Sequence, residues 1–211
     1  MKLQKALSYS PRSDFIAEVV QMVSGLLLVL FLWTHMLFVA SILVGSNAFN
    51  GLSYFMERYY LLPTAIVFLL LVGGAHVGVV LRRIPSRWAE QKIAWKHAKL
   101  IHHGDTWSWL FQSVTGSAIL ILAIIHVAVV TYGGIDVMYS SGRIKHGFIV
   151  FYAVLLLLAE YHASTGLYRI FVKWGWVRRH SLKRVLGVIT ILTVGLGAAS
   201  LWIFFTLGVH A

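Results

Sequence analysis

The chain has 211 residues, of which 59% are hydrophobic and 12% are charged, and its formal net charge is +11. A soluble domain normally carries about 25% charged residues, so the shortage of polar surface excludes a water-soluble bundle of this length. The sequence contains no cysteine, which excludes disulfides, iron–sulfur clusters and thiol chemistry within this chain.

Five long apolar stretches follow one another along the chain. Each reaches the roughly 20 residues that a helix needs to cross the hydrocarbon core of a bilayer. We therefore predict a single all-α domain over residues 1–211, an integral membrane bundle of five transmembrane helices. The helices are expected at residues 15–44, 62–84, 106–132, 146–173 and 182–209. The segments between them are expected to be outer loops near 45–61 and 133–145 and an inner connection near 84–105.

The positive charges are distributed unevenly over this topology. Fifteen of the eighteen Lys and Arg residues fall on one side, and only Arg58, Arg143 and Lys145 fall on the other. The positive-inside rule then predicts the N-terminus in the cytoplasm and the C-terminus in the periplasm, for a multi-pass protein of a bacterial inner membrane. The basic rim suits membrane lipid or an acidic cytoplasmic partner, and we expect no nucleic acid as a partner.

The first and third helices share a pattern. One contains "QMVSG" and then His35, and the other contains "QSVTG" and then His126, with the hydroxyl residue eleven positions before the histidine in both. Eleven residues are about three helical turns, so Ser24 is expected below His35 and Thr115 below His126, offset by about 16 Å. The candidates for cofactor contacts from this repeat are Gln21, Ser24, Gln112 and Thr115.

The second and fourth helices share a different spacing. His76 precedes Arg83 by seven residues, and His162 precedes Arg169 by seven residues. Each arginine is expected on the face of its histidine and about 10 Å nearer the cytoplasm. Counting along the helices therefore predicts an inner level with His76 and His162 and an outer level with the other two intramembrane histidines.

Paired imidazoles from facing helices at one level are what bis-histidine haem ligation requires. A lone intramembrane histidine could simply bond a neighbour, but four of them, one in each of four helices, favour a function. Zinc is disfavoured because each level offers two ligands and no cysteine or carboxylate to complete the site. Groups suited to haem propionates are Arg83, Arg169 and Lys173 at the inner edge, and Ser141 and Arg143 at the outer edge.

Two longer stretches, "HGDTWSWLFQSVTG" and "AEYHASTGLYRIFVKWGW", together with the order of the histidines, resemble a known family. This is the single-anchor, two-haem cytochrome b subunit of quinol:fumarate reductases and succinate:quinone oxidoreductases. The resemblance covers roughly residues 15–205. It implies two haems b, with His35 and His126 as axial ligands of the outer haem and His76 and His162 as ligands of the inner one.

The resemblance also implies roles for other residues. Gln21, Trp109 and Lys173 match family positions that contact haem propionates, whereas Ser141 and Arg143 match only loosely.

The resemblance implies a role for Glu160, whereas Glu57 stands where the chain departs from the family, whose outer loop before the second helix is longer. Glu160 matches a glutamate that relays protons across the membrane beside the haems, and it lies about 200° from His162 around a helix, away from the haem face. Glu57 is the carboxylate nearest the expected quinol side, and an exposed loop acid beside Arg58 is an equal alternative for it.

The implied function is that of a membrane anchor in a quinol:fumarate reductase. The anchor oxidises a menaquinol-type quinol and passes electrons through the two haems to cytoplasmic iron–sulfur and FAD-containing flavoprotein subunits, which reduce fumarate to succinate. The whole assembly could be a dimer of such heterotrimers.

Three alternatives stay open at this point. The anchor could serve a succinate dehydrogenase that runs in the reverse direction, or it could be the cytochrome b subunit of a hydrogenase or formate dehydrogenase. A hypothesis from a different class is a proton-coupled transporter, with Glu160 and the histidines as a relay.

Overall fold

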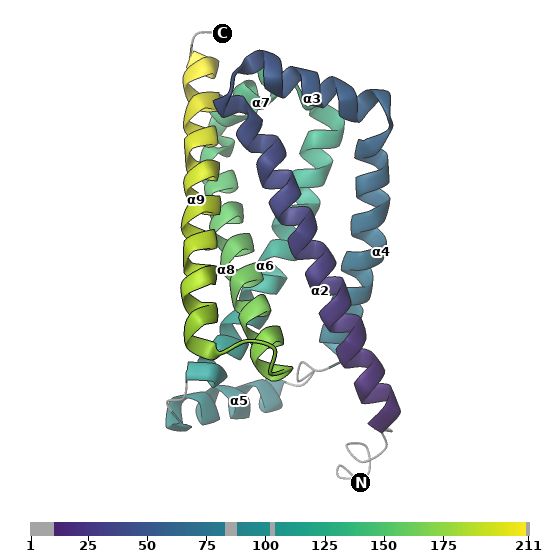
Figure 1. The fold of residues 1–211 in the computed structure, drawn as a ribbon, viewed down its shortest axis with the longest axis vertical. Coiled ribbons are helices and arrows are strands. Elements are labelled where there is room, and N and C mark those ends of the chain that lie inside the picture. Colours follow the sequence, from purple (N-terminus) through teal and green to yellow (C-terminus); the bar gives the residue numbers. More distant parts are fainter. Residues whose placement is uncertain (1–10, 83–87, 102–103, 210–211) are drawn as a thin grey trace.

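The computed structural model describes residues 11–82, 88–101 and 104–209, and these residues are almost entirely helical (Figure 1). The elements in chain order are α2 (Pro11–Ala40), η1 (Ser41–Leu43), α3 (Ser46–Arg58), α4 (Leu61–Leu81), α5 (Trp88–Ile101), α6 (Gly104–Gly133), α7 (Val137–Arg143), η2 (Ile144–Phe148), α8 (Ile149–Lys173) and α9 (Arg179–Val209). Five helical segments among them are long and apolar enough to cross a membrane. The predicted all-α class and the five spans are confirmed.

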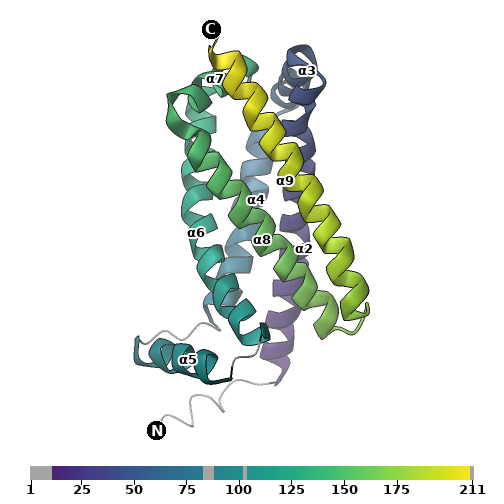
Figure 2. The ribbon, with the colours of Figure 1, turned by 90° about the vertical axis from the view of Figure 1, so that its left-hand side faces the viewer.

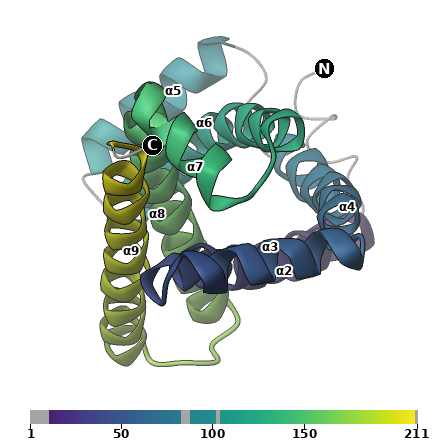
Figure 3. The ribbon, with the colours of Figure 1, turned by 90° about the horizontal axis from the view of Figure 1, so that it is seen from above.

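Four of the spanning helices, α2, α4, α6 and α8, surround a common axis, and α9 lies outside this ring (Figure 3). α4 packs on α2 and α6 packs on α8, while α9 packs against both α8 and α2. One buried cluster lies where α2, α8 and α9 meet and contains Val29, Ala163, Leu167, Leu182 and Leu186. A second cluster lies toward the end of the bundle that carries α3 and α7, and contains Ile42, Phe49, Ile144 and Phe204.

The segments predicted as loops are largely helical, and that part of the prediction is wrong. α3 fills most of 45–61, α7 lies within 133–145, and α5 lies within 84–105. α3 and α5 lie across the spans at opposite ends of the bundle (Figures 1 and 2). These helices are too short and too polar to span a bilayer, but a helix lying across the bundle needs only one apolar stripe. In α3 that stripe includes the buried Phe49 and Ser53, whereas Tyr54 and Phe55 are exposed.

Hydrogen bonds tie α3 to the turn between α6 and α7. The Ser53 hydroxyl lies 2.9 Å from the Phe49 carbonyl oxygen and 3.1 Å from the Ile135 carbonyl oxygen, and both can accept from it. The backbone N–H of Val137 donates to Oδ1 of Asn50 over 2.9 Å. Residues 87 positions apart in the sequence thus close one end of the bundle.

The fourth predicted helix corresponds to α8. A kink in η2 joins α8 to α7, so the continuous helical segment runs over Val137–Lys173. Gly147 has a φ of 101° at this kink, a conformation that residues with a side chain rarely adopt. The kink allows α7 to lie over the end of the bundle while α8 crosses it.

Phe204→Ala should destabilise the fold by about 3–5 kcal/mol, because the deletion leaves a cavity beside Phe49 in the second cluster. Unfolding by a denaturing detergent measures this change. Trp202→Ala is the matched control, because Trp202 lies on the same helix with 64% of its surface exposed. Equal losses in the two variants would contradict the assignment of this cluster to the core.

Candidate functional site

The two histidines of the predicted inner level each bond a hydroxyl from a neighbouring helix. Nδ1 of His76, from α4, lies 3.0 Å from Oγ of Ser24, from α2. Nδ1 of His162, from α8, lies 3.1 Å from Oγ1 of Thr115, from α6. The repeat placed Ser24 three turns below His35 of its own helix. In the structure, the hydroxyl of each repeat instead bonds a histidine of another helix: Ser24 bonds His76, and Thr115 bonds His162.

The hydroxyl protons of Ser24 and Thr115 are donated to backbone carbonyl oxygens, and this determines which imidazole nitrogen carries the proton. The Ser24 hydroxyl donates to the Val20 carbonyl oxygen over 2.6 Å, and the Thr115 hydroxyl donates to that of Phe111 over 2.8 Å. A hydroxyl carries one proton, so each oxygen is left to accept from the Nδ1–H of its histidine. The Nε2 atom of a neutral imidazole in this tautomer keeps its lone pair, which is the form that binds a metal.

Glycine follows each of these hydroxyl residues and brings the imidazoles close to the helix backbone. A Cβ atom built at Gly116 would lie 2.9 Å from Cε1 of His162, closer than real Cβ contacts allow. At Gly25 the same construction gives 3.4 Å to Cε1 of His76. Both halves of the repeat thus provide a hydroxyl and a bare backbone beneath a histidine ring.

Gln112 of α6 supports the backbone that carries His162: its side-chain amide donates to the backbone carbonyl of His162 over 2.9 Å. A Cβ atom at Gly166 would lie 3.2 Å from this amide nitrogen. Gln112 therefore holds α8 against α6, and its Oε1 is buried without a protein partner.

The histidines of the predicted outer level lie side by side. The ring centroids of His35, from α2, and His126, from α6, are 5.8 Å apart, with an angle of 66° between the rings. Phe31 stacks on His35 at 5.8 Å, and Tyr152 of α8 meets His126 edge-on at 5.5 Å. Nδ1 of His126 is buried without a hydrogen-bond partner. Neither aromatic residue was among the predicted site residues. Phe31 could have been found from its position four residues before His35 in the same helix, whereas Tyr152 could not, because it lies in a different helix from His126.

Ser141 and Arg143, the predicted outer contacts, stabilise the end of the bundle. Ser141 is buried and donates to the carbonyl oxygen of Val137 in its own helix. Arg143 donates from one guanidinium nitrogen to the Gly134 carbonyl over 2.7 Å and from another to Oγ of Ser140 over 3.1 Å. Its Nε is buried without a partner.

At the basic end, Nζ of Lys173 forms an ion pair of 2.6 Å with Oε1 of Glu18. Glu18 was not among the predicted residues, and it lies in α2 one turn before Gln21. Arg169 and Gln21 both have interactions within the protein. Arg83 and the side chain of Trp109 lie outside the described parts of the chain.

Glu160 is 1% exposed and faces α9, not the histidines. Its Oε1 accepts hydrogen bonds of 2.9 Å from both Ser164 and Thr190, whose hydroxyl oxygens are 2.7 Å apart. Its Oε2 is buried without a partner. The sequence allows Ser164 to be predicted as a partner of Glu160, because it lies one turn later in the same helix. It does not allow this for Thr190, which lies in α9. Glu57, in contrast, is exposed in the last turn of α3.

Comparison with known proteins places these features in a family. The family model described as "Succinate dehydrogenase/Fumarate reductase transmembrane subunit" matches residues 89–197. A protein of Helicobacter pylori named fumarate reductase cytochrome b subunit is 34% identical over 194 residues, which are 85% of this chain and 76% of the relative. The chain belongs to this family.

A further relative extends the match to another organism. The fumarate reductase cytochrome b subunit of Wolinella succinogenes is 33% identical over 169 residues, which are 74% of this chain and 65% of that protein. The family resemblance carried by the motifs is confirmed. The five spans and the family match show that this chain is a multi-pass membrane subunit. The predicted location in a bacterial inner membrane agrees with them.

The residues present fit the haem that a cytochrome b name implies. At the outer level the rings of His35 and His126 come from two helices and lie 5.8 Å apart between centroids, so two imidazoles are available together. Two axial imidazoles are what a haem iron takes, because the macrocycle fills the other positions. With Nδ1 turned to a hydroxyl, the inner histidines present Nε2 as the ligating atom, and the glycine beside each ring leaves room for the imidazole.

Thr190→Val should destabilise the protein by about 1–3 kcal/mol, because it removes a donor from the buried carboxyl group of Glu160 at nearly constant volume. Thermal or detergent unfolding measures the change. Thr131→Val is the matched control, since Thr131 is exposed and its hydroxyl bonds only the carbonyl of Val127 among the described contacts. Unfolding of the Thr190 variant at the wild-type midpoint would contradict a structural role for this contact.

Proposed function

We propose that this chain is the two-haem electron-transfer anchor of a quinol:fumarate reductase. The observation that carries the proposal is the pair of inner histidines, each with its Nδ1 within 3.1 Å of a hydroxyl oxygen from a neighbouring helix, which turns Nε2 away from that hydroxyl. His76 and His162 would hold the inner haem, and His35 and His126 the outer one. When bound, haem b supplies one-electron redox chemistry, and the protein sets its potential through the ligands and their surroundings.

The chain's own residues hold these ligands in position. Ser24 and Thr115 fix the tautomer and rotation of the inner imidazoles, and Gln112 fixes the backbone that carries His162. The outer imidazoles are held by aromatic contacts, with Phe31 on one ring and Tyr152 on the other. Propionate contacts at the inner edge are proposed for Gln21, Arg83, Trp109, Arg169 and Lys173, and at the outer edge for Ser141 and Arg143.

The proposed reaction begins with a menaquinol-type quinol, which gives up two electrons and two protons as it becomes the quinone. Glu57 is the candidate acceptor for a quinol proton, because it is an exposed carboxylate at the end opposite the basic rim. The electrons leave at the basic end, where an iron–sulfur subunit and an FAD-containing flavoprotein would dock on the cytoplasmic side. Fumarate takes up the two electrons and two protons there and becomes succinate; the reverse direction would use the same anchor.

Glu160 is the proposed proton relay beside the haems. Its Oε1 is held by Ser164 and Thr190, which leaves the buried Oε2 as the oxygen that can take up or release a proton. A charged residue in the interior of a membrane bundle is costly and commonly marks such a pathway. Because Glu160 faces α9, proton transfer and haem ligation would use opposite faces of α8.

The visible spectrum of the purified protein tests the proposal against the transporter alternative. Reduction should produce haem b absorption bands from two distinct haems. A preparation with intact helical structure and no such bands would overturn the cytochrome assignment. Association with flavoprotein and iron–sulfur subunits, tested by co-purification, separates this complex from those of hydrogenases and formate dehydrogenases.

Gly116→Ala should lower the haem content toward one per chain, because its Cβ would enter the space of the His162 ring. Thr115 holds that ring at Nδ1, so it cannot simply rotate away. Haem is measured against protein in the purified complex. The control is Gly195→Ala, where an added Cβ meets nothing within 4 Å. Wild-type haem content and an unchanged spectrum would argue against ligation by His162.

Glu160→Gln should keep both haems and slow proton-coupled turnover in liposomes by on the order of 100-fold, a magnitude typical of losing a positioned proton-transfer group. The substitution preserves the shape of the side chain and its contact with Thr190. Turnover is followed with a quinol analogue and fumarate, and haem content serves as the control for folding. Turnover at the wild-type rate would remove Glu160 from the proton path.

A further inference from the structure

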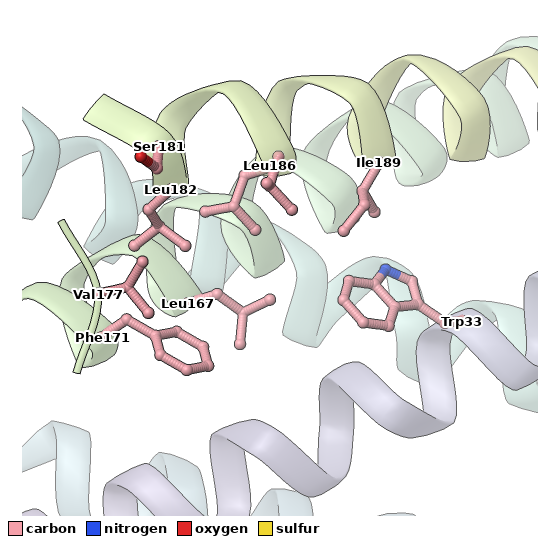
Figure 4. Close-up of a pocket in the computed structure, with 9 residues that line it drawn as sticks. Trp33, Leu167, Phe171, Val177, Ser181, Leu182, Leu186 and Ile189 are labelled. Carbon is pink, nitrogen blue, oxygen red and sulfur yellow. The ribbon is translucent and has the colours of Figure 1, made fainter. Parts of the chain in front are cut away.

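An apolar groove lies between α2, α8 and α9, on the side of the molecule away from α4 and α6. Its volume is about 350 Å³, and eight of its nine lining residues are apolar, the exception being Ser181. Figure 4 shows Trp33 of α2 across from Leu186 and Ile189 of α9, with Leu167 and Phe171 of α8 along the groove. The groove is partly open, and Val185, one of its lining residues, is 55% exposed.

The groove has the length and direction of a lipid chain in one leaflet. Its α9 residues extend from Ser181 to Ile189, which is about 12 Å along a helix axis. One leaflet of a hydrocarbon core is about 15 Å thick. Since α9 is a spanning helix, the groove runs from the bundle end where α9 begins toward the middle of the membrane.

Basic residues are concentrated at the end of the groove where α9 begins. Residues 178–184 include Arg178, Arg179, His180, Lys183 and Arg184, all of which are exposed. The sequence has no Asp or Glu after Glu160, so no acid close in the chain neutralises them. α9 also begins here, at Arg179, and the N–H groups of a helix N-terminus favour an anion.

An aromatic residue marks the level of the headgroups next to these cations. Trp176 is 52% exposed and packs edge-on against Phe171 of the groove at 5.5 Å. Exposed tryptophans are typical of the boundary between hydrocarbon and headgroups. The apolar groove therefore lies below this boundary, and the cations lie at it.

We propose that this groove binds the acyl chain of an anionic phospholipid whose phosphate is held by Arg178 and Arg179. Basic pockets beside spanning helices on the cytoplasmic side bind anionic headgroups in this way. Trp33 lines the groove, and its indole Nε1 is buried without a hydrogen-bond partner. A quinone ring would find a donor there for one carbonyl oxygen, but its second carbonyl would be left unpaired among apolar side chains.

The test compares lipid binding by the purified complex after delipidation in mild detergent. Phosphatidylglycerol and phosphatidylcholine with identical acyl chains are titrated, and bound lipid is counted by mass spectrometry. The wild type should prefer phosphatidylglycerol. Arg178→Gln with Arg179→Gln should lower its affinity by about 30-fold, which corresponds to about 1 kcal/mol for each arginine. Val185→Trp should weaken both lipids, because the larger side chain fills the groove.

The matched control is Arg58→Gln with Lys145→Gln, which removes two positive charges at the opposite end of the bundle and should leave the preference unchanged. Equal binding of the two lipids by the wild type, or an unchanged preference in the double arginine variant, would overturn the proposal. Release of the flavoprotein and iron–sulfur subunits from the double variant, with lipid binding intact, would assign these arginines to protein docking instead.

Discussion

An imidazole inside a membrane needs a partner for the nitrogen that carries its proton, and this requirement organises the centre of the bundle. At the inner level the partner is a hydroxyl that has already given its own proton to the helix backbone, from Ser24 for His76 and from Thr115 for His162. The second nitrogen is thereby left as a lone-pair donor. Burying a nitrogen lone pair in hydrocarbon costs free energy unless a ligand or a hydrogen bond pairs it.

The same requirement explains why glycine follows each hydroxyl residue. The imidazole reaches the hydroxyl only if its ring lies almost on the backbone of the neighbouring helix, and at Gly116 a Cβ would come within 2.9 Å of it. The ring of four helices thus contains two equivalent pairs, α2 with α4 and α6 with α8, each joined through one hydroxyl and one histidine. α9 stands outside the ring, where it supplies Thr190 to the buried Glu160 and one wall of the apolar groove.

Much of this architecture could be predicted from sequence, because spans and faces are properties of a single helix. Apolar length predicted the five spans. The helical form of 46–58 was missed because a helix lying flat on a bundle has no long apolar run. Partners on other helices were also missed: the spacing placed Ser24 below His35, but only the packing of α4 on α2 brings it to His76. The ion pair of Lys173 with Glu18 likewise depends on which helices are neighbours.

Four single His→Ala variants show whether the four histidines act as two ligand pairs. Each purified variant is titrated electrochemically while its visible spectrum is recorded. The His76 and His162 variants should lose the same haem, and the His35 and His126 variants should lose the other. Loss of different haems by His76→Ala and His162→Ala, or retention of both haems by any of the four, would contradict this pairing.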